Sequence, residues 1–310
     1  MAWRGFRRLG AAAAVALLVL LMVTSAQAIV DPPPGTPVLG SPPAQATGTP
    51  GPVPENVREA GALKGCEQRL QPARRPGVPA VAIVGASITA GVGAEDPAGS
   101  WAVLLVRQLH WNAFVYGVPG AGYVHPGLGR KGPIAAEIAR VHLPALQPAL
   151  VIVQAGHDDM SVPPCLERQR VKQTVATIQA EAPQAQIALV TVFPGRKRPP
   201  SIYRTDQAIV AGARAADPQV IIMDPLASGW RFTRVRDGLH PSPTGDAWIA
   251  GKVAGILRQH GVYPAPAGRD ATLCAIAIRA QADPIPALNR PAPHPAPDSP
   301  RLPYQVATVG

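Results

Sequence analysis

The chain has 310 residues, a length that suits one medium domain with tails or two small domains. Charged residues make up only 15% of the chain, below the roughly 25% typical of globular proteins, and 38 Pro and 30 Gly fill much of the difference. The net charge of +10 does not indicate nucleic-acid binding, because the basic residues are scattered and form no basic helix or aromatic platform. A mild attraction to an anionic cell envelope is the remaining expectation from this charge.

Residues 1–28 are predicted to be a signal peptide. Three arginines precede an apolar run from Ala11 to Val23, and Ala26-Gln27-Ala28 then offers a small-residue cleavage site. The run is shorter than the roughly 20 residues that a membrane span needs. We therefore expect cleavage near Ala28, and a mature protein that is secreted or associated with the cell envelope.

Pro-rich segments flank one folded domain. Residues 29–56 contain too few apolar side chains to form a core and are predicted to be a linker. The folded domain is expected over residues 57–263, and residues 264–310 are expected to be a Pro-rich C-terminal tail. Within that tail, Ala271 to Gln281 is predicted to form a short helix.

Strand and helix patterns alternate inside the domain. The strands are predicted at Val81–Val84, Ala113–Tyr116, Leu150–Val153, Ile187–Val192 and Val220–Met223. The helices are predicted at Trp101–His110, Pro133–Leu143, Glu167–Glu181, Asp206–Ala216 and Thr244–Arg258. This alternation predicts an α/β fold of three layers, with a doubly wound sheet of about five parallel strands. In such a sheet the ligand site lies at the carboxyl ends of the strands.

Three cysteines, Cys66, Cys165 and Cys274, permit at most one intrachain disulfide. Their spacing does not indicate a zinc site. Cys66 precedes the first strand and Cys274 follows the last helix, so both are expected at the amino end of the sheet. We therefore predict a Cys66–Cys274 disulfide, with Cys165 free.

The loop after the first strand presents a hydroxyl group. Ser87 stands in Gly85-Ala86-Ser87-Ile88-Thr89-Ala90-Gly91, which is neither a dinucleotide fingerprint nor a phosphate-binding loop. Taken alone, Ser87 is better explained as a helix N-cap than as a nucleophile.

A second loop supplies the groups that would activate such a hydroxyl. Asp237 and His240 stand three residues apart, just before the last predicted helix. An imidazole takes the proton of a serine, and a carboxylate holds the imidazole in the required tautomer. The alternative is that Asp237 caps a turn and His240 is a surface residue.

Four short blocks resemble those of the SGNH/GDSL hydrolase family, in the family's order. They are Gly85–Gly91, Tyr116–Ala121, Gln154–Asp159 and Asp237–Pro241. The first three follow predicted strands, the last precedes the final helix, and the resemblance covers about residues 80–259. It implies the flavodoxin-like fold of that family and a serine esterase.

The resemblance also implies roles for individual residues. Ser87, Asp237 and His240 take the positions of the catalytic triad. The backbone N–H groups of Ser87 and Gly120 take the positions of oxyanion donors. His157 and His125, beside the third and second blocks, are expected to contact the substrate.

Two positions depart from the family pattern. Ala86 replaces an Asp that is not the nucleophile. Asp158 replaces the Asn whose side chain donates to the oxyanion, and an ionised carboxylate has no proton to donate. Asp158 would serve only if burial raised its pKa and kept it protonated.

Three hypotheses about function follow. The first is an esterase for short acyl esters such as acetyl groups, on small-molecule, carbohydrate or cell-envelope substrates, that works without metal or organic cofactor. The second is an O-acyltransferase with the same triad. The third is a non-catalytic member that binds acylated glycans or lipids, which the replacement at Asp158 favours. The oligomeric state is left open.

Overall fold

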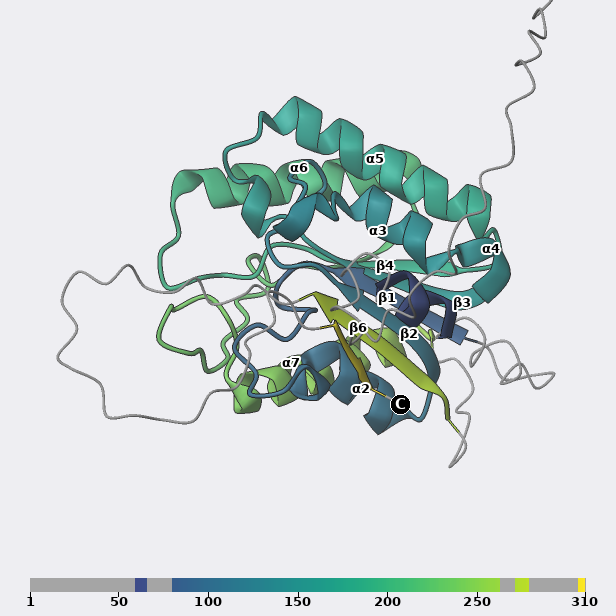
Figure 1. Cartoon of the computed structure of the whole chain (residues 1–310). Helices are drawn as coiled ribbons and strands as arrows, with labels where there is room; N and C mark the ends of the chain where they lie inside the picture. The colour runs from purple at the N-terminus through teal and green to yellow at the C-terminus, as the bar shows by residue number, and fades with distance from the viewer. Residues whose placement is uncertain (1–58, 66–79, 263–270, 279–305, 310) are drawn as a thin grey trace, which may run out of the picture. The chain divides into compact units, whose positions relative to one another are not determined.

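A seven-stranded sheet forms the centre of the folded domain (Figure 1). The computed structural model describes residues 59–65, 80–262, 271–278 and 306–309, the last segment by its backbone alone. The predicted signal peptide and linker lie outside these residues. No helix in the described ranges is long and apolar enough to cross a membrane.

Six of the seven strands run parallel. In chain order the strands are β1 (Ala80–Gly85), β2 (Asn112–Gly117), β3 (Pro148–Gln154), β4 (Gln186–Val190), β5 (Ile221–Met223), β6 (Leu273–Ile278) and β7 (Val306–Val309). Their order across the sheet is β5-β4-β3-β1-β2-β6-β7, and only β7 pairs antiparallel with its neighbour. The predicted doubly wound parallel sheet is thus confirmed.

Helices cover both faces of the sheet and make three layers (Figure 1). One face carries α2 (Trp101–Leu109) and α7 (Pro243–Gln259). The other carries α3 (Ile134–Val141), α4 (Leu143–Leu146), α5 (Pro164–Glu181) and α6 (Pro200–Ala216). All five predicted helices are present, although α6 begins six residues earlier than predicted, with Pro200 in its first turn.

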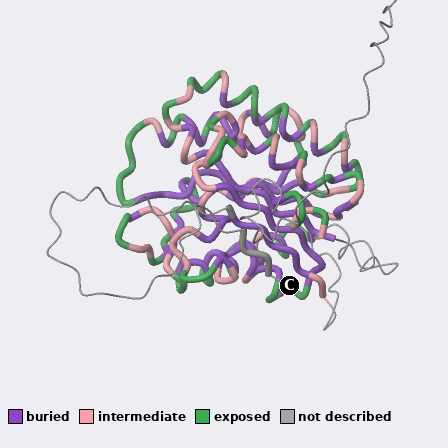
Figure 2. Tube along the Cα trace, viewed as in Figure 1, coloured by how far each residue is buried: buried purple, intermediate pink, exposed green. Residues whose placement is uncertain are grey.

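The strands are buried on both faces, as the purple of the central strands in Figure 2 shows. In β1, Val81 and Ile83 pack with the residues of α2 and α7, whereas Ala82 and Val84 pack with those of α3, α5 and α6. This double burial is why the strands are continuous apolar runs rather than alternating ones.

The predicted helix over Ala271–Gln281 is wrong, because Leu273–Ile278 is strand β6 of the sheet. Its backbone pairs parallel with β2, which satisfies N–H and C=O groups along an otherwise open edge. Leu273 packs into the core on the α2 and α7 side, whereas Cys274 packs into the core on the other side. Pairing and two-sided burial thus outweigh the helix preference of the alanines. The predicted C-terminal tail accordingly contains two strands of the sheet, β6 and β7.

The predicted state of Cys165 is confirmed, since it is free and exposed at the start of α5. Cys274 is buried in β6. Cys66 lies outside the described residues, so the Cys66–Cys274 pairing stays a prediction.

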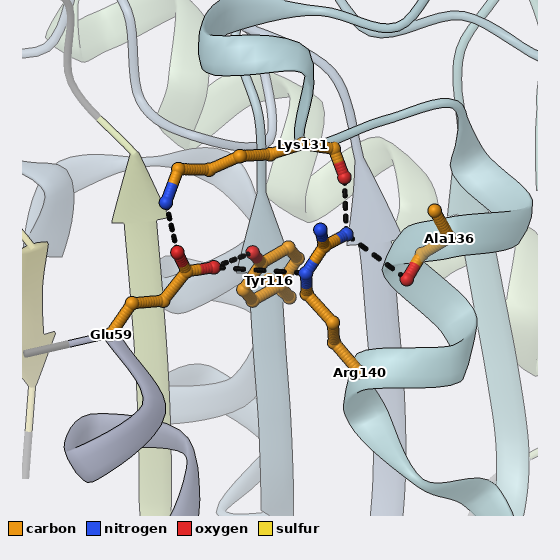
Figure 3. Close-up of polar contacts among 5 residues, drawn as sticks. All are labelled: Glu59, Tyr116, Lys131, Ala136 and Arg140. Carbon is orange, nitrogen blue, oxygen red and sulfur yellow. Dashed lines mark hydrogen bonds and ion pairs between the residues drawn. The ribbon is translucent and has the colours of Figure 1, made fainter. Parts of the chain in front are cut away.

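A polar cluster attaches the helical segment over residues 59–65 to the domain (Figure 3). Glu59 accepts a hydrogen bond from the Tyr116 hydroxyl and forms ion pairs with Lys131 and Arg140. Arg140 in α3 also donates to the backbone carbonyl groups of Lys131 and Ala136. Burial and the Glu59 hydrogen bond raise the pKa of Tyr116, so the hydroxyl stays neutral and donates. The cluster thereby joins the chain ahead of β1 to the loop that follows β2.

Candidate active site

The candidate site lies at the carboxyl end of β1. The chain continues from β1 to β2 on one side and later returns to place β3 on the other side. β1 is flanked by β2 and β3, which makes this edge the topological switch point of the sheet. The loops after β1 and β2 are joined by a hydrogen bond from the Val118 N–H to the Gly85 carbonyl, of 2.9 Å. The loops after three neighbouring strands therefore gather at the carboxyl edge.

The turn that carries Ser87 is held by Gln154 at the end of β3. The Ala86 N–H donates to the Gln154 backbone carbonyl at 3.0 Å. The backbone N–H and the hydroxyl of Thr89 donate to the Gln154 side-chain oxygen at 3.2 Å and 2.9 Å. Ser87, between these anchors, is partly exposed. The hydroxyl therefore stands on a fixed turn that a substrate can reach.

Ser87, His240 and Asp237 form a continuous hydrogen-bonded line. The Ser87 Oγ lies 2.9 Å from the His240 Nε2, and the His240 Nδ1 lies 2.6 Å from the Asp237 Oδ2. The other carboxylate oxygen, Asp237 Oδ1, accepts the backbone N–H groups of Leu239 and His240 at 2.8 Å and 3.0 Å. The structure thus brings together the three residues that the sequence predicts as a triad, across 153 residues of chain.

The carboxylate of Asp237 is held in its ionised form. Partial burial works to raise its pKa, but the hydrogen bonds from the His240 imidazole and from the Leu239 and His240 N–H groups outweigh burial and lower the pKa. An ionised carboxylate at Nδ1 keeps the proton of the imidazole on that nitrogen. The Nε2 is then free to accept the proton of Ser87.

Close packing against the loop after β1 fixes the position of His240. Gly93 has a φ of +97°, and a Cβ atom on it would lie 2.5 Å from the Pro241 carbonyl oxygen and 3.0 Å from the His240 Cβ. Only glycine permits this contact at low cost. On the other side of the loop, Ser242 caps α7 by accepting the Gly245 N–H at 3.3 Å. The histidine is therefore held between a glycine contact and a helix cap.

The loop after β2 is held by a buried acid that the sequence analysis missed. Asp159 is fully buried, and its carboxylate accepts the backbone N–H groups of Tyr123 at 2.5 Å, His125 at 2.9 Å and Val124 at 3.3 Å. His125, expected to contact substrate, places its Nδ1 2.8 Å from the carbonyl oxygen of Gly120. Since a carbonyl only accepts, this nitrogen carries the proton. Asp159 thus positions the loop, and the hydrogen bond from His125 fixes the orientation of the Gly120 carbonyl.

Two backbone N–H groups at the site are uncommitted. In the part of the chain that the structure describes, no backbone carbonyl or side chain accepts a hydrogen bond from the N–H of Ser87 or of Gly120. Gly120 has a φ of +74°, a left-handed conformation that glycine adopts readily. Uncommitted N–H groups beside a nucleophile are what an oxyanion requires.

Asp158 lies in the short 3-10 helix His157–Asp159 that follows β3. Burial raises the pKa of Asp158, and the charge of Asp159 raises it further, whereas His125 and His240 lower it by a smaller amount. Both imidazoles are thus close enough to Asp158 to act on its charge. A raised pKa favours the protonated acid, which has an O–H to donate.

His157 lies close enough to His240 to respond to its charge. Burial lowers the pKa of His157, a hydrogen bond with the Phe193 backbone opposes this effect, and the charge of His240 lowers it further. Its Nδ1 is buried and has no hydrogen-bond partner in the described part of the chain. The lowered pKa favours the neutral imidazole, and one of its nitrogens is buried without a partner among the described residues.

A second missed acid lies behind Asp159. Glu167 in α5 is buried, and burial together with the neighbouring Asp159 carboxylate raises the pKa of Glu167 to about 9. Glu167 could not be singled out from the sequence, because its helix has the pattern of a solvent-exposed helix. Asp158 and Asp159 did carry a signal: two adjacent acids just after a buried strand indicate that one of them points inward. In the described ranges, no group of three or more His, Cys, Asp or Glu residues is placed to hold a metal ion.

Three solved structures are similar to this chain, and the first of them supports the fold. One solved chain aligns with a TM-score of 0.50 at 17% identity, over 59% of this chain and 97% of that chain. A family two carbohydrate esterase from Cellvibrio japonicus aligns with a TM-score of 0.49 at 17% identity, over 60% of this chain and 62% of its own. A lipolytic protein of the G-D-S-L family from Desulfitobacterium hafniense DCB-2 aligns with a TM-score of 0.48 at 16% identity, over 58% and 99%.

Comparison of sequences identifies the family. The GDSL lipase Rv0518 of Mycobacterium tuberculosis is 28% identical over 193 residues, which are 57% of this chain and 80% of that protein. The model of the GDSL-like Lipase/Acylhydrolase family matches residues 83–248, more than half of the chain and all four sequence blocks. The chain therefore belongs to the GDSL-like lipase/acylhydrolase family and is a serine hydrolase that acts on ester bonds.

Proposed function

We propose that this protein is an exported esterase that removes short acyl groups, such as acetyl, from carbohydrate or other cell-envelope carriers. The observation that carries the proposal is the hydrogen-bonded line from the Ser87 Oγ through His240 to Asp237, at 2.9 Å and 2.6 Å. This line supplies a nucleophile, a base and an orienting carboxylate in contact with one another.

In the proposed acylation step, the Ser87 Oγ attacks the ester carbonyl carbon while its proton passes to the His240 Nε2. The carbonyl oxygen becomes an oxyanion, which the N–H groups of Ser87 and Gly120 and the O–H of protonated Asp158 stabilise. The intermediate then collapses and its C–O bond to the alcohol breaks. His240 returns its proton to the departing alkoxide, which leaves acyl-Ser87 and a free alcohol.

Deacylation repeats these steps with water. His240 takes a proton from water as the water oxygen attacks the acyl carbon, and the same donors hold the second oxyanion. The carbon–oxygen bond to Ser87 breaks, and His240 protonates the Ser87 Oγ. The products are a carboxylic acid and the free enzyme, and Asp237 stays ionised throughout.

The surroundings of the site support a short acyl group. Among the described residues, the large hydrophobic side chains that are exposed are Tyr203 and Trp248, so no broad apolar surface for a long chain is evident there. His157, whose pKa responds to the charge of His240, is proposed to contact the substrate. His125 is proposed to line the same space while it holds the Gly120 carbonyl.

Export is a separate part of the proposal. Its support is the arrangement of residues 1–28: three arginines, an apolar run and Ala26-Gln27-Ala28. Expression of the full chain followed by N-terminal sequencing of the extracellular and cell-bound fractions tests it. Mature protein that begins at Ile29 supports export, and full-length protein retained in the cytoplasm contradicts it.

The catalytic assignment is tested by hydrolysis of p-nitrophenyl acetate and by acid quench followed by mass spectrometry of the acylated peptide. Ser87→Ala removes the nucleophile, so turnover is expected to fall by about 10⁴-fold or more, and the acyl adduct on the Ser87 peptide to disappear. Ser228→Ala, an exposed serine in the loop after β5, is the matched control and keeps full turnover. Unchanged turnover in folded Ser87→Ala contradicts the assignment.

A further inference from the structure

We propose that the esters hydrolysed by this protein carry a negative charge on the alcohol side, and that an arginine cluster at the mouth of the site binds it. The arginine cluster consists of Arg196 and Arg198 in the loop after β4, and Arg234 in the loop that leads to the triad residues Asp237 and His240. This inference rests on the proposed catalytic role of Ser87 and adds a substrate class to it.

Arg196 lies directly on the loop that carries the triad. Its backbone N–H donates to the Gly238 carbonyl at 2.7 Å. A Cβ atom built on Gly238 would lie 3.0 Å from the Arg196 Cβ and 3.3 Å from its Nε, so the guanidinium stem covers this glycine. Gly238 stands between Asp237 and His240, which places Arg196 beside the reacting groups.

Arg234 is held rigidly on the same loop. One of its guanidinium nitrogens donates to the Pro194 carbonyl at 2.7 Å and another to the Phe232 carbonyl at 3.2 Å. The guanidinium carbon lies 4.1 Å from the centre of the Phe232 ring, a cation–π contact. The segment around Arg234 also pairs with Pro241, next to His240. A fixed guanidinium of this kind loses little side-chain entropy when it binds an anion.

Within the described ranges, no acidic side chain is paired with the arginine cluster. Residues 193–199 and 231–240 contain six Arg and Lys residues and one acid, Asp237, whose carboxylate is already engaged by His240. No ion pair between described residues involves Arg196, Arg198 or Arg234. Burial, followed by the charges of Arg198 and Arg196, lowers the pKa of Arg234, as expected for guanidinium groups that lie close together. Arginines crowded without an acid bind carboxylate or phosphate groups well.

The test compares two acetyl esters of similar size, the anion 4-acetoxybenzoate and the neutral 4-acetoxybenzamide. The quantity measured is the ratio of their kcat/KM values, in which differences in folded fraction cancel. In Arg196→Gln/Arg198→Gln the ratio of anionic to neutral ester is expected to fall by about three- to tenfold. Arg234 is left in place, because its hydrogen bonds also support the fold.

Arg258→Gln is the matched control. It removes one positive charge at the far end of α7, about 22 Å from the first turn of that helix at the site, so the ratio is expected to match that of the wild type. Raising the NaCl concentration from about 0.02 M to about 0.5 M should lower the wild-type ratio, and lower the ratio of the double variant less.

Each failure has its own signature. If Arg196→Gln/Arg198→Gln changes both kcat/KM values by the same factor, the arginine cluster does not select the anion and the inference is overturned. If Ser87→Ala hydrolyses both esters at the wild-type rate, the proposed function fails, whatever the ratio. Loss of both esters in Ser87→Ala with an unchanged ratio in the double variant overturns only the substrate class.

Discussion

Replacing Asp158 by Asn removes the one titrating group among the proposed oxyanion donors. Below its raised pKa, Asp158 is protonated and donates its O–H; above that pKa it is ionised, donates nothing and repels the oxyanion. Loss of one such donor costs about 10²–10³ in rate, which corresponds to ~2.7–4 kcal/mol of transition-state stabilisation. An asparagine at this position keeps an N–H donor at every pH.

The expected result is a change in the shape of the pH profile. For the wild type, kcat/KM for p-nitrophenyl acetate is expected to fall as pH rises through the raised pKa of Asp158, because the oxyanion then loses one donor. In Asp158→Asn this fall disappears, so the variant should exceed the wild type by about 10²–10³-fold above the pKa of Asp158. On the acid side, where Asp158 is protonated, the two proteins should agree within about threefold.

The thermal stability of the two proteins should also differ mainly at alkaline pH. Because the pKa of Asp158 is raised on folding, its contribution to stability is fully present below the unfolded pKa and is lost as pH rises through the folded pKa. Asp158→Asn is therefore expected to melt at a higher temperature than the wild type at alkaline pH, with little difference at acid pH.

Kinetics from about pH 5 to pH 9 with parallel thermal melts provide the assay, and Glu181→Gln at the end of α5 is the matched acid-to-amide control. A folded Asp158→Asn that is slower than the wild type at every pH would refute the reasoning. Asp158 would then act as a base or as a substrate ligand rather than as a protonated oxyanion donor.

Three further variants test the supports of the site. Gly93→Ala places a Cβ 2.5 Å from the Pro241 carbonyl oxygen, so it should lower the free energy of unfolding by about 1–3 kcal/mol and reduce kcat. Denaturant unfolding measures the first effect, and an unchanged free energy of unfolding would contradict this packing. Asp159→Asn weakens three charge-assisted bonds to the loop that carries Gly120, so kcat should fall more than KM rises, whereas a pure KM effect would exclude loss of oxyanion donors. Glu167→Gln removes a buried carboxyl whose pKa is about 9. The wild type should lose stability as pH rises from about 4.5 to about 9, and the variant should lose less. The same dependence of the melting temperature on pH in both proteins would contradict burial of an ionisable carboxyl.

Much of the fold could be predicted because its signals are local. Five strands and five helices were placed correctly, since continuous Val and Ile runs between helical patterns leave few arrangements other than a doubly wound sheet. The rule that loops at the carboxyl ends of parallel strands share one edge indicated where the site would lie, and the resemblance to the SGNH/GDSL family implied Ser87, Asp237 and His240 as its triad.

Other features depended on residues far apart in the chain. Leu273–Ile278 has no strong strand preference of its own and becomes β6 because the open edge of β2 accepts it. The two adjacent acids after β3 differ only in three dimensions: Asp159 turns inward to bind three backbone N–H groups, and Asp158 stays beside the two imidazoles.

The sequence by itself therefore determined the layer architecture, because the hydrophobic period is a property of neighbouring residues, and its four family blocks indicated the candidate catalytic groups. Only the tertiary structure decided which edge strand completes the sheet, which carboxyl groups have their pKa raised by burial, and that Arg196, Arg198 and Arg234 come together near His240. These outcomes depend on burial and on distances between loops, and neither is encoded in any one segment of the chain.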